Sequence, residues 1–127
     1  MLAVARIVNV SKGTTVAEQA RVARSYWSRL IGLTGRSSLE EGEGLLLSPC
    51  SSVQCFLMRF PIDVIFIDRE AQVVKVVSDL RPFRVALGGR GAWAAVEVPT
   101  GTAQRSGTEA GDHLTIRDDG QKEDEEK

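Results

Sequence analysis

The stretch from Pro49 to Asp68, PCSSVQCFLMRFPIDVIFID, decides the fold of this 127-residue chain. It contains the longest apolar run in the sequence, and Gln54, Arg59 and Asp63 are embedded in that run. Burying such polar or charged groups is costly unless each finds a partner. The stretch is therefore either a core element with an internal Arg59–Asp63 pair or the floor of a binding site.

The most regular part of this region is a pair of strands. Residues Asp63–Ile67 combine Val, Ile and Phe on both faces, which predicts a central strand that is covered on both sides. A four-residue turn at 68–71 leads into a β-branched return strand, Gln72–Val77. Pro61 cannot donate a ladder hydrogen bond, so we expect a strand end, bulge or edge just before Asp63.

The remaining pattern predicts a mainly β protein, a compact single domain of the β-sandwich or barrel-like type with one short helix at about 26–34. A second helical turn is expected at Thr102–Ser106, and residues 78–91 have the composition of a loop. The further expected strands are Ala3–Val10, Thr14–Ala23, Leu45–Leu47, Val53–Met58, Ala92–Val98 and His113–Arg117.

Charge divides the chain into two parts. Residues 118–127 carry six acids and two lysines, a net charge of −4, and no large apolar side chain, which predicts a disordered acidic tail. Residues 1–117 carry fourteen Lys and Arg against eleven acids, a net charge of +3. We therefore expect one globular domain at 1–117 followed by the tail.

Composition excludes several classes of function. A formal net charge of −1 gives no argument for nucleic acid or for an anionic membrane, and no apolar run approaches the length of a membrane helix. No targeting segment is evident, so a cytoplasmic location is expected. Cys50 and Cys55, with the single His113, do not make a zinc site, and we expect free thiols, no metal and no cofactor.

Arg59 and Asp63 are the first candidates for a site. A guanidinium can hold a carboxylate or phosphate through two hydrogen bonds, and Asp63 would orient it. The structural alternative is an ion pair, or a carboxylate bound to backbone N–H groups that fixes the bulge near Pro61. The loop that contains Arg81 and Arg84 is a further candidate for anion binding, with a solvated loop tied to the tail or to Asp79 as its alternative.

The acids and the cysteines suggest two other arrangements. Glu97 and Asp112 could converge with Asp63, and paired carboxylates serve acid/base catalysis or bind a hard cation. A nucleophilic cysteine would need a nearby base, and the sequence offers only one histidine. Structural thiols in a β core are the simpler interpretation of both cysteines.

Four segments of the sequence resemble a known family. The chain is similar to the domain-of-unknown-function 192 family, also called uncharacterised protein family 0127, over about residues 14–117. The matching pieces are Trp27–Arg36 to its Arg-x-x-Gly-Leu-x-Gly-Arg motif, Pro49–Asp68 to its central signature, Leu80–Arg84 to its Pro-aromatic-Arg loop, and Glu97–Gly101 with Gly111–Asp112 to its closing Glu-Leu-x-x-Gly and Gly-Asp pieces.

The resemblance implies a fold rather than a reaction: a compact, mostly β sandwich with a short helix. Two positions depart from the pattern, since Gln54 stands where relatives often have His and Thr34 where they often have Met or Leu. If the family site uses an imidazole as base or metal ligand, this chain does not supply it at position 54.

Three functions therefore stay open, and whether the chain is an enzyme is one of the questions. The favoured hypothesis is a non-catalytic module that binds a small anion or peptide at the central signature. The alternatives are an acid/base or metal-assisted enzyme with converged carboxylates, and an accessory or scaffold protein that binds a protein partner. The candidate ligand-binding residues are Gln54, Met58, Arg59, Asp63, Arg81, Arg84 and Glu97.

Overall fold

The structure is a computed structural model that describes residues 3–23, 39–50, 52–54, 60–82 and 84–117. The described part is mostly strand, with one short helix, α2, at Thr102–Ser106. The mainly β fold is therefore confirmed. The strands are β1 Ala3–Asn9, β2 Thr14–Ala23, β3 Glu43–Leu47, β4 Ser52–Gln54, β5 Ile62–Ile67, β6 Val73–Leu80, β7 Val85–Leu87, β8 Ala94–Pro99 and β9 Leu114–Arg117.

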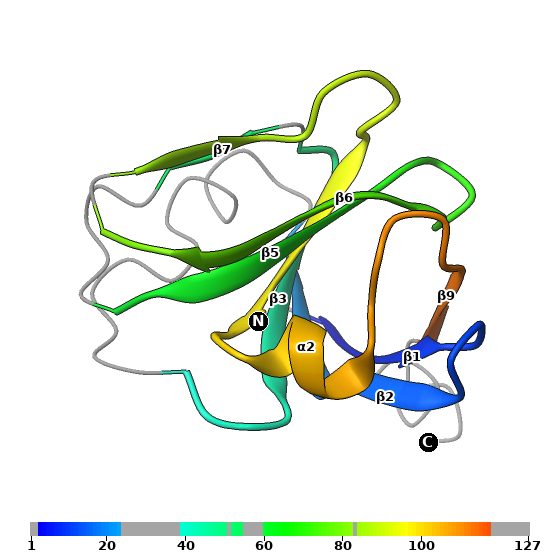
Figure 1. Cartoon of the computed structure of the whole chain (residues 1–127). Coiled ribbons are helices and arrows are strands. Elements are labelled where there is room, and N and C mark those ends of the chain that lie inside the picture. The colour runs from blue at the N-terminus through cyan, green and yellow to red at the C-terminus, as the bar shows by residue number, and fades with distance from the viewer. Residues whose placement is uncertain (1–2, 24–38, 51, 55–59, 83, 118–127) are drawn as a thin grey trace.

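Seven of these strands form one sheet in the order β6-β5-β8-β3-β2-β1-β9, and β4 pairs with β7 in a separate two-stranded sheet. All pairs are antiparallel except β2 with β3, which run parallel. In Figure 1, β7 lies above β5 and β6 at the top of the view, and β1 and β2 lie at the bottom.

The seven-stranded sheet curls into a half-barrel, because the start of β6 meets the segment that leads into β9. The Val73 N–H donates to the Asp112 carbonyl at 2.7 Å, and the Gly111 N–H donates back to the Val73 carbonyl at 2.8 Å. The Leu114 N–H donates to the Ala71 carbonyl at 2.9 Å. These bonds satisfy backbone groups that would otherwise form open sheet edges.

Side chains on the concave side fill the half-barrel, and we call them the inner cluster. Every strand of the large sheet contributes at least one of them, as period-2 alternation requires. The inner cluster consists of Ala5, Ile7, Val16, Ala17, Ala20, Val22, Leu46, Ile65, Ile67, Val73, Ala94, Val96, Val98 and Leu114.

A second group, the outer cluster, lies on the opposite face of the central strands. All six residues of β5 are buried, so this strand is covered on both sides as its composition predicts. Close packing of the neighbouring strand also explains the glycine at position 44 on β3, because an added Cβ would lie 3.1 Å from the Glu97 carbonyl oxygen. The outer cluster consists of Ala23, Leu39, Leu45, Leu47, Ile62, Val64, Phe66, Leu80, Ala86 and Ala95.

One expectation is corrected by the structure, and two others concern residues that it does not describe. Residues 78–91 are not all loop, since β6 continues to Leu80 and β7 occupies Val85–Leu87. The helix expected at 26–34 and the acidic tail at 118–127 lie outside the described residues. Within the described residues, no helix is both long and apolar enough to cross a membrane.

Candidate functional site

Asp63 is a buried carboxylate that binds backbone N–H groups. It is 1% exposed. Its Oδ1 accepts from the Asp79 N–H at 2.8 Å and from the Thr100 hydroxyl at 3.5 Å. Its Oδ2 accepts from the N–H groups of Gly101 and Ala103, each at 3.0 Å. The side chain therefore ties β5 to β6 and to the start of α2.

The backbone around Asp63 explains why a carboxylate is needed there. Ile62 lies opposite Leu80 and Val64 lies opposite Val77, so β6 carries one extra residue across from Asp63. Such a bulge leaves an N–H group outside the regular ladder. Asp79 lies in this bulge with a φ of 56°, the left-handed conformation that aspartate tolerates better than most residues.

Replacing Asp63 with asparagine is expected to destabilise the fold. An amide has a single acceptor oxygen, and its NH₂ group would face N–H donors that now bind Oδ2, so we expect a loss of about 2–4 kcal/mol in the free energy of unfolding. Urea denaturation measures this. Thr100→Val removes the Thr100 hydroxyl bonds to Asp63 and Asp79 but keeps the three backbone N–H bonds to Asp63, so it is the matched control and should cost less. Equal, small losses in both variants would contradict this role of Asp63.

Arg81 is the exposed end of the same network. Its Nε and Nη2 donate to Asp79 Oδ2 at 3.1 and 3.0 Å, and the Thr100 hydroxyl donates to Asp79 Oδ1 at 3.2 Å. The Arg81 side chain is 71% exposed. Arg84 is also exposed, and its N–H donates to the Arg81 carbonyl at 3.2 Å. The buried Asp63 thus holds Asp79, and Asp79 fixes the guanidinium at the surface.

Glu97 lies on the other face of the sheet. It pairs with Leu45 on β3 and Val64 on β5, both members of the outer cluster, and it is 4% exposed. Burial raises the pKa of its carboxyl from 4.5 to about 8. Asp63 pairs with Val98, the next residue along β8, so the Asp63 and Glu97 side chains point to opposite faces.

The Asp112 carboxylate is bound by a third set of residues, distinct from those around Asp63 and Glu97. Its Oδ2 accepts from the Asn9 amide at 2.9 Å, and its Oδ1 accepts from Lys12 Nζ at 2.7 Å. The Asn9 bond first, and the Lys12 bond second, lower the pKa of Asp112 to about 2. The alternative in which Glu97 and Asp112 converge with Asp63 is therefore not what the structure shows. Among the described residues, no three His, Cys, Asp or Glu side chains are arranged to hold a metal ion.

Several predicted residues are placed only in part. The backbone of Gln54 lies in β4, opposite Val85 of β7. Met58, Arg59 and Cys55 lie outside the described residues.

Cys50 and His113 complete the candidates from the sequence. Cys50 is half-buried against the outer cluster, and its N–H donates to the Trp93 carbonyl at 2.6 Å. His113 is exposed, and its N–H donates to the Ser11 hydroxyl.

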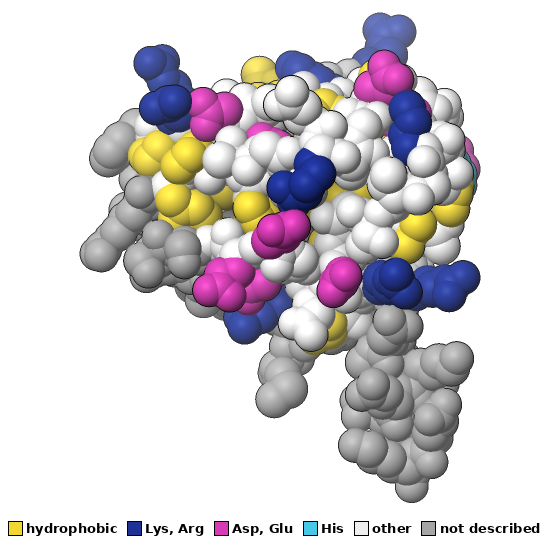
Figure 2. Space-filling view, turned by 60° about the horizontal axis from the view of Figure 1, so that its bottom comes forward, with side chains coloured by type: hydrophobic (Ala, Val, Ile, Leu, Met, Phe, Trp, Pro, Cys, Tyr) yellow, Lys and Arg dark blue, Asp and Glu magenta, His cyan; other side chains and the backbone are white. Residues whose placement is uncertain are grey.

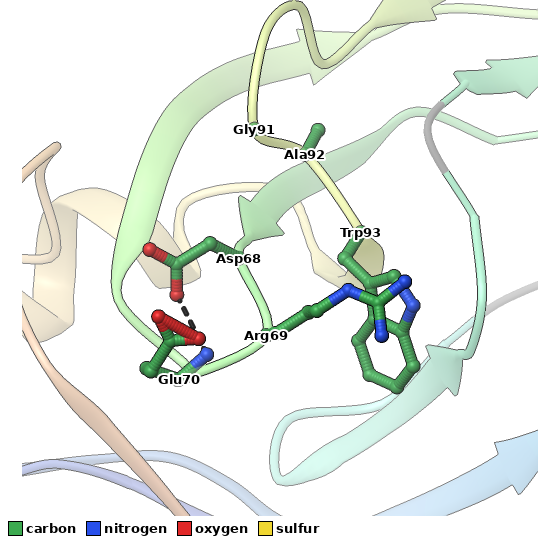
Figure 3. Close-up of a pocket in the computed structure, with 6 residues that line it drawn as sticks. All are labelled: Asp68, Arg69, Glu70, Gly91, Ala92 and Trp93. Carbon is green, nitrogen blue, oxygen red and sulfur yellow. Dashed lines mark hydrogen bonds between the residues drawn. The ribbon is translucent and has the colours of Figure 1, made fainter.

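Sequence reasoning missed one pocket, which lies at the far end of β5 from Asp63. The Arg69 guanidinium lies 5.4 Å from the centre of the Trp93 ring, and the carboxylates of Asp68 and Glu70 extend to the other side of the turn, away from that pair (Figure 3). Three charged residues in one turn were the only signal in the sequence. The pocket has a volume of about 390 Å³ and is lined by Asp68, Arg69, Glu70, Gly91, Ala92 and Trp93.

Comparison with known families gives a clear match. The model of the DUF192 family, whose description is "Uncharacterized ACR", matches residues 7–116. The chain belongs to the DUF192 family. It is 31% identical to an uncharacterised protein family 0127 protein of Pyrococcus furiosus, over 85% of this chain and 95% of that one. A relative of the same name from Pyrococcus horikoshii is 32% identical, over 85% of this chain and 96% of its own length.

A solved structure shares the fold of this DUF192 chain. The crystal structure of a protein of unknown function from Novosphingobium aromaticivorans superposes with a TM-score of 0.77 and 20% sequence identity. The match covers 90% of this chain and 84% of that one. At this level of identity the likeness supports the half-barrel architecture alone.

Proposed function

We infer that this DUF192 chain is a non-catalytic binding module that holds a small oxyanion, a carboxylate or a phosphate, at the Arg81–Arg84 loop. One observation carries the proposal: the exposed Arg81 guanidinium is fixed by Asp79, and Asp79 is fixed by the buried Asp63. A cation whose position is set by the core loses less conformational freedom when a ligand binds.

The chemistry of Arg81 suits this class of ligand. A guanidinium has five N–H donors, and Asp79 uses one on Nε and one on Nη2, which leaves three for a ligand. The remaining donors lie in a plane that matches two oxygens of a carboxylate or phosphate. Arg84 adds a second exposed positive charge in the same loop.

The arrangement of acids favours binding over acid/base catalysis. General acid/base chemistry with two carboxylates needs both within reach of one substrate. Asp63 and Glu97 point to opposite faces of the sheet, and Asp112 is bound to Asn9 and Lys12. The four hydrogen bonds that Asp63 accepts also make it a support for the site rather than a contact to the ligand.

A second candidate function rests on the surface of β7. Val85 and Leu87 are 47% and 61% exposed, whereas Ala86 between them is buried in the outer cluster. Two large apolar side chains on one short strand are compatible with an accessory protein that docks a partner there. A partner whose binding is lost in Val85→Ser/Leu87→Ser and kept in Arg81→Gln would favour this function.

Binding at Arg81 is tested by following backbone amide NMR shifts during titration with inorganic phosphate, and with a short peptide that has a free or an amidated C terminus. We expect saturable shifts that centre on residues 79–85. Arg81→Gln should weaken binding about tenfold, because one guanidinium–oxyanion pair contributes on the order of 1–2 kcal/mol.

Arg21→Gln is the matched control, because Arg21 is an exposed arginine on β2 and lies outside the loop. It should bind as the wild type does. Binding of the free but not the amidated peptide would assign a peptide carboxylate, and binding of phosphate alone would assign a small anion. Shifts spread over the whole surface, or equal weakening in both variants, would reject a specific site.

A further inference from the structure

We propose that Glu97 anchors a second binding site, on the outer-cluster face of β8, and that this site takes the primary ammonium group of a small apolar amine. Asp63 and Glu97 point to opposite faces of the sheet, so the site is separate from the network that holds Arg81. The proposal therefore does not rest on the oxyanion site, and each of the two sites is tested independently.

The side chains around Glu97 are apolar. Its direct cross-strand neighbours are Leu45 on β3 and Val64 on β5, and Ala95, two residues earlier on β8, shares its face. All three are buried members of the outer cluster. They offer contact surface for an alkyl chain and no polar side-chain atom for the carboxyl group.

No positive charge faces Glu97 from the strands that flank it. On β5 every residue except Asp63 is apolar, and Asp63 points to the other face. On β3 the diagonal neighbour on the same face is Glu43, which is itself an acid. Cys50, which packs against the outer cluster, carries a thiol. Among the described residues, Glu97 therefore lacks the counter-charge that a cationic ligand would supply.

The Glu97 carboxyl group is accessible although the residue is buried. Within the described part of the chain, this group forms no hydrogen bond and no ion pair. Every fully enclosed side-chain nitrogen or oxygen of the described residues does have a hydrogen-bond partner. The Glu97 oxygens are therefore not fully enclosed, and they contribute to the 4% exposure of the residue. A ligand group that approaches from solvent can meet them directly.

The other two buried acids of the described structure show what is missing at Glu97. Asp63 accepts four hydrogen bonds, and Asp112 is bound by Asn9 and Lys12. A buried acid without such partners weakens the fold at neutral pH, and strongly perturbed acids of this kind gather at functional sites. A ligand cation would offset this cost, because it pairs with the charged form.

An ammonium group suits the site better than an anion or a metal ion. Glu43 and an ionised Glu97 would both repel an anion. A hard metal ion needs several oxygen ligands, and the described residues hold no group of three acids, cysteines or histidines that could provide them. An ammonium group donates up to three hydrogen bonds to a carboxylate, and its alkyl chain is able to pack on Leu45 and Val64.

Binding of a cation should release a proton from Glu97. Burial raises the pKa of its carboxyl to about 8, so the free protein holds this proton at pH 7, whereas an ion pair favours the ionised form. Roughly one-tenth of the molecules are ionised at pH 7 and roughly nine-tenths at pH 9, and an alkylamine stays protonated at both. The apparent dissociation constant should therefore fall about tenfold between pH 7 and pH 9.

The test compares n-butylammonium chloride with n-butanol, which has the same alkyl chain and no charge. The readout is the NMR shift of the Leu45 and Val64 methyl groups during titration at pH 7 and at pH 9, at constant ionic strength. We expect n-butylammonium to bind saturably at pH 9 with a dissociation constant on the order of 1 mM. Butanol should bind at least about tenfold more weakly, because it cannot form the ion pair.

Two variants complete the test. Glu97→Gln should weaken n-butylammonium binding at least about tenfold at pH 9 and remove its dependence on pH, since an amide does not ionise. Glu18→Gln, at an exposed acid on β2, is the matched control and should bind as the wild type does. Equal binding of the two compounds, a dissociation constant that is the same at both pH values, unchanged binding in Glu97→Gln, or no saturable shift would overturn the proposal.

Discussion

Replacing Glu97 with glutamine is expected to raise the stability of the protein at about pH 8 and to leave it nearly unchanged at about pH 4. The cause is the burial that raises the pKa of Glu97 from 4.5 to about 8. As the pH rises through this window, the unfolded chain loses the Glu97 proton and the folded chain keeps it. The free energy of unfolding should therefore fall by up to about 1.4 kcal/mol per pH unit.

The sign is opposite to that of an ordinary paired carboxylate. Below about pH 4.5 both states hold the proton, and above about pH 8 both have lost it, so the slope is confined to the interval between. Asp112 acts in another window. Its pKa of about 2 means that its contribution is complete above about pH 4 and is lost only in stronger acid.

Urea denaturation at several pH values measures the effect of Glu97→Gln. The variant should show a flatter curve between about pH 5 and pH 8 than the wild type, and it should be more stable by several kcal/mol at the upper end. Glu18→Gln, an exposed carboxylate on β2, is the control and should keep the wild-type slope. A wild-type curve that is flat over this interval would show that Glu97 is ionised in the fold.

Phe66→Ala is expected to cost about 3–5 kcal/mol in the free energy of unfolding, because it removes a ring that is 0% exposed in the outer cluster. Urea denaturation at about pH 6 measures the loss. Val85→Ala, at a 47% exposed apolar residue, is the matched control and should change stability by no more than about 0.5 kcal/mol. A loss below about 1 kcal/mol for Phe66→Ala would contradict its placement in the core.

A substitution at Gly88 also tests the packing around Phe66. A Cβ at this position would lie 2.7 Å from Phe66 Cδ1 and 2.5 Å from the Ala92 Cβ, so Gly88→Ala should overpack the site and destabilise it. In a Phe66→Leu background the clash with the ring is removed, and the added cost of Gly88→Ala should be smaller. Strictly additive losses would show that residues 66 and 88 do not touch.

The sequence predicts the strands well where one short-range pattern governs them. The hairpin of β1 and β2, the turn between β5 and β6, and the coverage of β5 on both faces all follow from residue type and period. The helical turn at Thr102–Ser106 is confirmed with the same bounds.

The pairings that depend on distant parts of the chain were not predictable in this way. The parallel pairing of β2 with β3 joins segments separated by a long connection, and no local pattern signals it. The strand β7 was missed because three residues between arginine- and glycine-rich segments carry too little pattern to distinguish a strand from a loop.

The sequence predicts the residues of the candidate site better than the hydrogen bonds that link them. Asp63 was singled out because a charge in an apolar run needs partners, and one alternative, a carboxylate bound to backbone N–H groups, is what the structure shows. That Asp63 holds Asp79, and through it Arg81, depends on a bulge that residue spacing does not reveal.

The acids do not converge for a different reason. Asp63 and Glu97 lie on opposite faces because paired residues of neighbouring strands share a face, and Asp63 pairs with Val98 rather than with Glu97. A register of this kind is fixed by packing of the whole sheet. Figure 2 shows acidic and basic side chains interspersed on the surface that it draws, so charge alone did not mark a site there either.

The most direct test of an oxyanion site is the NMR signal of the Arg81 side-chain Nε–H during titration with inorganic phosphate. We expect this signal to shift saturably, while the Nε–H signal of Arg21 on β2 does not. The Arg81 signal should also be visible before phosphate is added, because its N–H donates to Asp79. An Arg81 signal that stays unchanged while phosphate shifts other arginines equally would contradict the proposed function.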